Sequence, residues 1–304
     1  MKRKTDKLLI ILACLFIFIG CNKADYQAPV PTYLYIKPFA LQVRPDNSQG
    51  ANSASILDAW VFQDGKFLGS YGIPSLIPIQ KTGKSIFVFN AGIRNSGQDD
   101  QRLMYPMYAS YTDTLALIPK AIDSISPIVN YVDNSKFALL EDFDGNGSSF
   151  EVYSQQEGSI YYKQGDTVIK VNDSNNNTWK ANNLVGLFTP TDSTYVMDYQ
   201  SKVVSDLPLS TPVYLEFDYK SDFPFTVGYW VNDPSGNVKQ VPDIYIGADG
   251  IKPGWNKMYL DLSLNISTSP AGSSYRIFFR LDKGDNVAAK PHLYIDNIKL
   301  IFLQ

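Results

Sequence analysis

Acidic residues are closely spaced at two places in the C-terminal half of the chain. Glu141, Asp142 and Asp144 lie in the stretch "LEDFD", and Glu216 and Asp218 lie in "VYLEFDY". Two carboxylates that flank a glycosidic bond can cleave it, so these residues are the candidates for sugar-chain hydrolysis. However, carboxylates two residues apart on a strand share one face, and this spacing is typical of the outward face of a sandwich. The sequence therefore favours a protein that is not an enzyme.

Composition limits the other kinds of catalytic and metal site. The chain has one histidine, His292, and its two cysteines, Cys14 and Cys21, both lie near the N-terminus. A zinc site with two histidines cannot be built from this set. Neither a G-x-S-x-G nucleophile motif nor a glycine-rich phosphate loop is present. We interpret His292 as a loop residue at the start of the last strand.

Aromatic and arginine side chains on two predicted strands indicate a sugar-binding surface. Sugar rings stack on aromatic side chains, and a few polar groups fix their orientation. In "FTVGYWVND", Trp230 points away from the apolar stripe, as do Arg276, Phe278 and Arg280 in "SYRIFFRLD". These four side chains could line one exposed surface, although an arginine beside a tryptophan can equally cover a solvated sheet. Trp179 in the polar loop "NDSNNNTW" is a second possible platform.

The last predicted strand places a carboxylate among apolar residues. Read with a period of two, "PHLYIDNIKLIF" (residues 291–302) puts Tyr294, Asp296, Ile298 and Leu300 on one face. A buried carboxylate is costly unless a cation or hydrogen-bond donors accompany it. We therefore expect Asp296 to be a metal ligand or a hydrogen-bond acceptor that ties the ends of its domain together.

The N-terminus has the pattern of a secretion signal. Basic residues precede the apolar run "LLIILACLFIFIG", residues 8–20, which is shorter than the roughly 20 residues that cross a bilayer. Gly20-Cys21 resembles a bacterial lipobox, in which the cysteine is acylated and the preceding signal, here residues 1–20, is removed. The alternatives are an ordinary signal peptide with an incidental cysteine, an uncleaved anchor, or acylation at Cys14, which would strand apolar residues on the mature chain.

Removal of residues 1–20 changes the charge and the cysteine content. Four basic residues and one acidic residue would be lost, leaving a net charge of about −6 and no disulfide. An acidic surface argues against nucleic acid as a partner and against electrostatic docking on anionic lipid. Membrane attachment would come instead from the covalent lipid on Cys21. The predicted location is the outer membrane, on its periplasmic or its cell-surface side.

Short alternating segments separated by turn residues fill the rest of the chain. The 20 tyrosines and 17 phenylalanines favour strands over helices. Asp64-Gly65, between "AWVF" and "KFLGSY", predicts a two-residue hairpin turn. Trp60 in this hairpin and Trp255 at a later strand start are interpreted as core residues.

A second series of alternating segments begins near residue 135 and divides the mature chain into two parts. We predict an all-β protein of two β-sandwich domains, residues 33–134 and 135–304, that follow a lipidated tether of residues 21–32. The run "VFQDGKFLGSYGIP…GKSIFVFNAG" is similar to small transthyretin-like or PEGA-type domains. From residue 137 onward, "LEDFD", "VYLEFDY", "GWNKMYLDL" and "LYIDNIKL" resemble the galactose-binding-like jelly roll of many carbohydrate-binding modules.

The jelly-roll resemblance implies a structural calcium ion. In such domains calcium often lies where the first strand meets the last, and it takes six to eight oxygen ligands. The matching positions are Glu141 or Asp142 in the opening strand and Asp296 in the closing strand. The alternative is that "DGNG" is only a tight turn and that Asp296 bonds to backbone amides.

Together these features predict a non-catalytic envelope lipoprotein that binds glycan through its C-terminal jelly roll. The alternative is a structural subunit of an outer-membrane secretion, adhesion or motility assembly, in which the sandwich faces would be protein interfaces. The expected partners are the membrane, through the lipid anchor, together with a glycan or other envelope proteins.

Overall fold

The computed structural model describes residues 30–156, 162–167, 169–172, 184–190, 194–284, 286 and 288–304. The predicted signal peptide, Cys21 and Trp179 lie outside these residues. No helix in the described part of the chain is long and apolar enough to cross a membrane.

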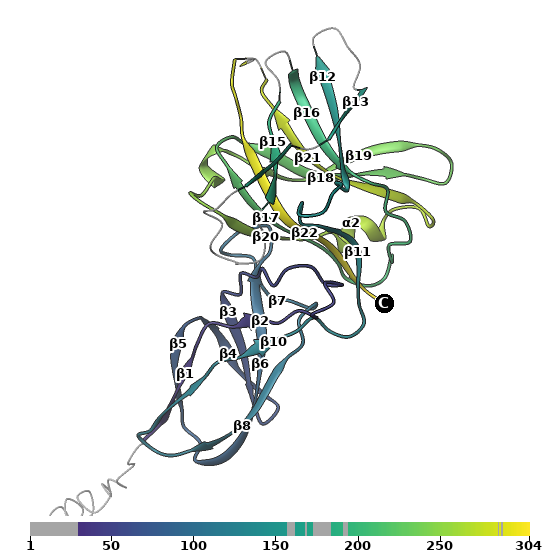
Figure 1. Cartoon of the computed structure of the whole chain (residues 1–304). Coiled ribbons are helices and arrows are strands. Elements are labelled where there is room, and N and C mark those ends of the chain that lie inside the picture. The colour runs from purple at the N-terminus through teal and green to yellow at the C-terminus, as the bar shows by residue number, and fades with distance from the viewer. Residues whose placement is uncertain are drawn as a thin grey trace, which may run out of the picture.

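Strands β1 to β10 form three small sheets in the N-terminal part of the chain (Figure 1). Their bounds are β1 (Thr32–Ile36), β2 (Ala40–Leu41), β3 (Asp58–Gln63), β4 (Lys66–Gly72), β5 (Ser75–Ile79), β6 (Gly83–Arg94), β7 (Arg102–Met104), β8 (Tyr111–Leu117), β9 (Ile122–Ile125) and β10 (Ile128–Val129). One sheet has the order β5-β1-β9, another pairs β10 with β2, and the third has the order β4-β3-β6-β7, with β8 also paired to β6. The inward residues of the first and third sheets share one apolar core that includes Leu34, Ile77 and Phe87.

The predicted hairpin turn joins β3 to β4. Gln63 pairs with Lys66, so two residues form the loop, and Asp64 and Gly65 have φ angles of 49° and 78°. Two-residue hairpins favour a turn whose twist matches that of the strands, and this turn requires positive φ at both central positions. The prediction from Asp64-Gly65 is confirmed.

The C-terminal part is a sandwich of two six-stranded sheets. Its elements are β11 (Ser135–Glu141), β12 (Phe150–Gln156), β13 (Tyr162–Thr167), β14 (Ile169–Asn172), β15 (Leu184–Phe188), β16 (Thr194–Ser201), β17 (Val213–Ser221), β18 (Phe225–Asn232), β19 (Val238–Ile246), η1 (Ala248–Gly250), β20 (Asn256–Asp261), α2 (Ser263–Ser267), β21 (Ser274–Asp282) and β22 (Leu293–Leu303). One sheet has the order β14-β15-β22-β17-β20, with β11 also on β22, and the other has the order β13-β12-β16-β21-β18-β19. Residues of both sheets, such as Phe217 and Phe279, meet in one core cluster. The predicted all-β fold with a C-terminal jelly roll is confirmed.

The closing strand β22 does not keep a period of two. Against β17, Lys299 pairs with Glu216 and Asp296 pairs with Asp218, so β22 has one extra residue in this interval. The irregularity includes Asn297, whose φ is 51°, and an extra residue of this kind is a β-bulge. Asp296 therefore shares the outward face of Asp218, while Ile298 belongs to the sandwich core. The expectation that Asp296 and Ile298 share one face is wrong because of this bulge.

The N-terminal part covers the outward face of β22, β17 and β20. Tyr105 lies between the two parts, with ring centroids 5.1 Å from Tyr214 and 5.0 Å from Tyr259. Tyr108 and Tyr131 extend this aromatic layer and are also buried. The face that the sequence assigned to solvent is therefore a domain junction.

Four charged side chains are buried under this tyrosine layer. Glu216, Asp218 and Lys257 have side chains with 0% exposure, and Lys299 is 1% exposed. The Lys257 ammonium lies 3.4 Å from both the Glu216 and the Asp218 carboxylates. We call these four residues the junction cluster.

Hydrogen bonds from the N-terminal part complete the junction cluster. Glu216 accepts hydrogen bonds from the Tyr105 and Tyr131 hydroxyls at 2.5 and 3.0 Å, and the Ser53 hydroxyl donates to Asp218 at 2.5 Å. From its own sheet, Asp218 accepts a hydrogen bond from the Asn297 side chain at 2.8 Å. Because a buried charge is costly without such partners, docking of the N-terminal part satisfies groups that would otherwise need water.

The junction cluster predicts that stability rises with pH above neutrality. Burial lowers the pKa of Lys299 from 10.5 to about 7. Between these values the unfolded chain binds a proton that the folded chain does not, so the free energy of unfolding rises by at most about 1.4 kcal/mol per pH unit. We expect this rise in urea titrations at pH 7, 8 and 9, and we expect Lys299→Met to remove it.

The matched control is Lys239→Met, because Lys239 is exposed and its substitution should leave the pH dependence intact. Measurements stop at pH 9 because burial raises the pKa values of the junction tyrosines, which ionise near 10 when unfolded. The same slope in the Lys299→Met chain and the parent chain would contradict the assignment.

Candidate functional site

The four residues predicted to form a sugar-binding surface lie together on the outward face of β18 and β21. Trp230 pairs with Arg276 across these strands. The Trp230 and Phe278 ring centroids are 6.3 Å apart, and the Arg280 guanidinium carbon lies 5.4 Å from the Phe278 centroid. The sequence thus placed these side chains on the correct face, although the fifth predicted residue, Trp179, lies outside the described residues.

Polar side chains on this sheet face already form hydrogen bonds and ion pairs with other groups of the protein. Arg280 bonds to both oxygens of the buried Asp198 at 2.6 and 3.0 Å. Arg276 forms an ion pair with Glu151 at 3.1 Å. Phe278 is only 1% exposed, so its ring offers no platform to a ligand. The face is therefore a packed layer. Among the described residues, the half-buried Trp230 is its one predicted aromatic platform.

Glycine at position 228 explains why Phe278 is buried on an outward face. Gly228 pairs with Phe278, and a Cβ added at Gly228 would lie 2.8 Å from the Phe278 ring. The ring therefore fills the space that a side chain on β18 would occupy. A glycine inside a strand is a recognised sign of such a close approach, but the alternation of residues alone does not show it.

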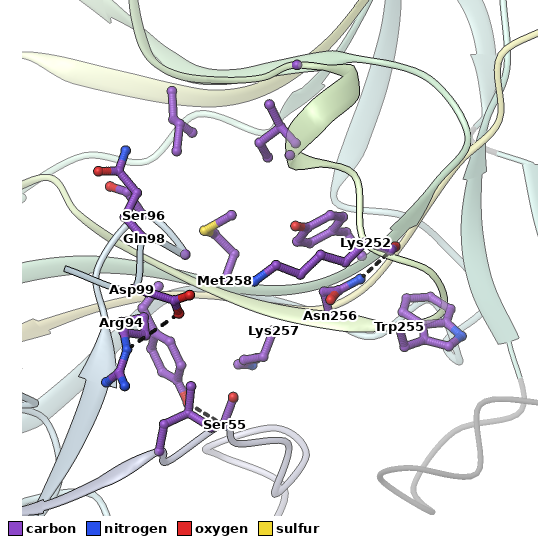
Figure 2. Close-up of a pocket in the computed structure, with 18 of the residues that line it drawn as sticks. Ser55, Arg94, Ser96, Gln98, Asp99, Lys252, Trp255, Asn256, Lys257 and Met258 are labelled. Atoms are coloured by element: carbon purple, nitrogen blue, oxygen red, sulfur yellow. Dashed lines mark hydrogen bonds and ion pairs between the residues drawn. The ribbon is translucent and has the colours of Figure 1, made fainter. Parts of the chain in front are cut away.

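A hollow between the two domains was missed by sequence reasoning. It has a volume of about 380 Å³ and is lined by the end of β6 with the following loop, by the end of β19, and by β20 with its preceding loop. In Figure 2, Trp255 lies at one end, Asp99 and Arg94 lie at the other, and the Lys252 side chain extends between them. We call this hollow the interdomain groove.

Hydrogen bonds hold the groove walls against one another. The Ser96 amide donates to the Tyr259 carbonyl at 2.8 Å, and the Ser55 amide donates to the Tyr259 hydroxyl at 2.9 Å. The Asn95 side chain accepts a hydrogen bond from the Asp261 amide at 3.0 Å. Two N-terminal segments are therefore bonded to strand β20, which makes the groove a property of the docked pair of domains.

Aromatic rings flank the groove. Trp255 is half-buried and lies against Lys220, whose ammonium is 5.5 Å from the Trp255 ring centroid and 4.5 Å from that of Tyr294. Tyr245 is 66% exposed and lines both the groove and a second hollow of about 430 Å³ beside Phe278 on the sheet face. The expectation that Trp255 is a core residue is wrong, because the strand it precedes lies at the edge of its sheet.

Trp60 also differs from its predicted place in the core. It is half-buried on the outward face of β3 and stacks on Phe67, with centroids 5.6 Å apart and an interplanar angle of 27°. Residues on either side of it, Ala59 and Val61, are the ones that are fully buried. The alternation of β3 therefore places Trp60 on the half-exposed face.

Polar groups of several kinds surround the groove. The Arg94 guanidinium pairs with the buried Asp58 and lies 3.8 Å from the exposed Asp99. The Asn256 amide nitrogen donates to the Lys252 carbonyl at 3.2 Å, which fixes the side chain at the wall. The Lys252 ammonium makes no ion pair within the described part of the chain. Amide, hydroxyl and charged groups beside an aromatic ring suit a ligand with many hydroxyl groups and apolar ring faces.

The carboxylates proposed as calcium ligands have hydrogen-bond partners within the protein. Strand β11 pairs with β22 and brings Glu141 opposite Ile298, as the jelly-roll resemblance implies. Glu141 accepts hydrogen bonds from the backbone amides of Phe143 and Ser149. Asp296 accepts one from the Asn297 amide at 2.7 Å, and Asp142 accepts one from the amide two residues later at 3.2 Å.

These contacts offer an alternative to the predicted calcium site, which stays a prediction. Among the described residues, no group of three or more histidine, cysteine, aspartate or glutamate side chains is arranged to hold a metal ion. Glu141 closes the turn after β11 through its two amide bonds instead. The bond from the Asn297 amide to Asp296 agrees with the alternative given for that residue.

Glu141→Gln should therefore destabilise the protein whether or not calcium is present. Glutamine offers one acceptor oxygen in place of two, so one of two backbone amides loses its partner, at a cost of about 1–3 kcal/mol. Urea titrations in calcium and in EDTA should show the same loss. Asp142→Asn is the control, because Asp142 is exposed and its change should cost no more than about 0.5 kcal/mol. A calcium-dependent loss in both variants would contradict this assignment.

Solved structures similar to this chain include several carbohydrate-binding modules. A structure of promiscuous carbohydrate-binding modules from the β-sandwich superfamily is 15% identical, with a TM-score of 0.38, over 82% of this chain and 86% of that chain. A family 11 module of a cellulosomal cellulase from Clostridium thermocellum is 17% identical, with a TM-score of 0.31, over 54% of this chain and 93% of that chain.

A further similar structure is the enzymatically active domain of tailspike protein 4 from bacteriophage CBA120. It is 15% identical, with a TM-score of 0.40, over 62% of this chain and 26% of that chain. No protein family matches the chain, and no curated protein matches it. With identities this low, these similarities do not identify a ligand for this chain.

Proposed function

We propose that this chain is a non-catalytic carbohydrate-binding protein whose binding site is the interdomain groove. The observation that carries the proposal is the pair of accessible aromatic rings, Trp255 and Tyr245, on one hollow that also presents amide, hydroxyl and charged groups. A volume of about 380 Å³ lies within the range of small-molecule sites. A sugar ring stacked on Trp255 would have the Asn256 side chain beside it, and the Lys252 ammonium would lie farther along the groove, toward Met258 (Figure 2).

The sheet face around Trp230 supports the proposal less well than the groove does. Its arginines are already paired with Asp198 and Glu151, and a ligand would have to break those ion pairs to use them. The groove keeps Lys252 available and presents Trp255 at its wall. Tyr245 lies between the two hollows, so a longer saccharide bound in the groove would extend toward the sheet face across this ring.

The placement of carboxylates favours binding over hydrolysis. Glycosidases use two carboxyl groups about 5–10 Å apart on either side of the bond they cleave. Asp99 is the one acidic residue that lines the groove in the described part of the chain. Three strand carboxylates that pair with groove residues, Asp58, Glu216 and Asp218, are fully buried. The proposal therefore assigns no catalytic residue to the groove.

The proposal also includes attachment to the cell envelope. The apolar run of residues 8–20 followed by Cys21 supports export and acylation, with the mature chain tethered to the outer membrane. A tethered binding protein would hold glycan near the cell surface or in the periplasm without the need for catalysis.

Glycan-array binding followed by calorimetry tests the site. Trp255→Ala should weaken binding of the best array ligand about thirtyfold, because loss of one stacked ring costs about 2 kcal/mol. Tyr245→Ala should weaken long saccharides more than short ones. Trp230→Ala is the matched control on the sheet face and should leave the affinity within about twofold.

Two outcomes would contradict the proposal. If Trp230→Ala abolishes binding and Trp255→Ala does not, the sheet face is the site. If no glycan binds and other envelope proteins co-purify with the chain, a structural subunit of an envelope assembly is the better interpretation.

A further inference from the structure

The outward face of the sheet β5-β1-β9 carries no charged residue. Tyr33 of β1 pairs with Pro78 of β5 and Ile122 of β9. Tyr35 pairs in the same way with Leu76 and Ser124. Residues that pair across neighbouring strands share a face, so these side chains form one surface. We call these six residues the tyrosine face.

The tyrosine face is exposed, and the opposite face of the same sheet is core. Tyr33 and Tyr35 are each 36% exposed, Leu76 is 50% exposed and Ile122 is 65% exposed. Leu34 between the two tyrosines is 0% exposed. A sheet with one buried face normally presents polar residues on the other. A continuous uncharged outward face instead marks a surface that contacts an apolar partner.

Lysines lie at both ends of the tyrosine face. Lys37 is exposed two residues after Tyr35, and its amide donates to the Ile125 carbonyl of β9 at 2.9 Å. Lys120 is exposed at the other end, where its amide donates to the Pro31 carbonyl at 3.0 Å. No acidic residue occupies any of the six positions. The chain is acidic overall, but this surface is locally apolar with a basic border.

The position of the tyrosine face along the chain brings it near the proposed lipid on Cys21. β1 is the central strand of this sheet, and it begins at Thr32, eleven residues after Cys21. Eleven residues span at most about 40 Å, so a lipid on Cys21 would hold this face close to the bilayer. In Figure 1, β1 and β5 lie at the end of the molecule away from the C-terminal sheets.

We propose that the tyrosine face docks on the phospholipid membrane surface. Tyrosine is enriched at membrane interfaces, where its ring reaches the acyl boundary and its hydroxyl stays with the headgroups. Leu76 and Ile122 supply further apolar area between the rings, and Lys37 and Lys120 contact lipid phosphates at the border. The docked protein would point its C-terminal sandwich and the groove away from the membrane. The proposal does not depend on what the groove binds, and it rests on the proposed acylation of Cys21.

Quenching by nitroxide-labelled lipid tests the contact. The full chain is reconstituted into phosphatidylethanolamine–phosphatidylglycerol vesicles after a bimane dye is attached at Leu76→Cys or, as control, at Leu264→Cys. Leu264 is 76% exposed and belongs to α2 in the C-terminal sandwich. The parent chain with its own two cysteines is treated in parallel as the blank. Quenching by headgroup-labelled lipid should be at least fivefold stronger at position 76 than at position 264.

A second variant separates the tyrosine face from the tether. Tyr33→Ser with Tyr35→Ser in the Leu76→Cys chain should reduce quenching at least threefold, while an unchanged melting curve shows that the fold is intact. Equal quenching at positions 76 and 264 would overturn the proposal, because the tether alone would then account for the contact. Protection of the dye accompanied by a doubling of mass in detergent would also overturn it, since a second copy would then cover the face.

Discussion

The structure depends on four charges that are buried where the two domains meet. Lys257 pairs with both Glu216 and Asp218, and the Lys299 side chain bonds to the Ala51 carbonyl and the Tyr131 hydroxyl. Buried ionisable groups of this kind still need further hydrogen-bond partners. Tyrosine hydroxyls of the N-terminal part and the Ser53 hydroxyl supply several of them. Separation of the domains would therefore expose an aromatic layer and leave charged groups without these partners. A buried ionic junction of this kind favours one docking geometry over alternatives, because few arrangements satisfy every group.

The interdomain groove follows from that docking geometry. Its walls come from the loop after β6 and from β20, and Tyr259 links them through its carbonyl and its hydroxyl. Tyr259 also belongs to the aromatic layer over the junction cluster, beside Tyr105. The contact that stabilises the junction thus also sets the width of the groove. A ligand that bridges the two walls would in turn stabilise the docked state, because binding to one arrangement favours that arrangement.

Local sequence patterns predicted those features that depend on near neighbours. The Asp64-Gly65 turn, the outward direction of Trp230 and the pairing of the first jelly-roll strand with the last are all present. Asp296 was assigned to the wrong face because one bulge residue shifts the alternation of β22. Burial of Phe278 depends on a glycine of a neighbouring strand. The groove was missed because segments near residues 96 and 255, far apart in the sequence, meet only after the domains dock.

The junction also decides whether the two ends of the molecule can act together. The tyrosine face lies on the N-terminal domain, whereas both domains form the groove. In the proposed membrane-docked state, a flexible connection between the domains would leave the C-terminal wall of the groove without a fixed direction relative to the membrane. The junction cluster removes that freedom, because rotation about the junction would break the Tyr105–Glu216 and Ser53–Asp218 bonds together. A charge pair that merely stabilised one domain would have no such effect. In the proposed membrane-docked state, the orientation of the groove would follow from which side chains are buried between the domains, and a lipid on Cys21 would add only proximity to the bilayer.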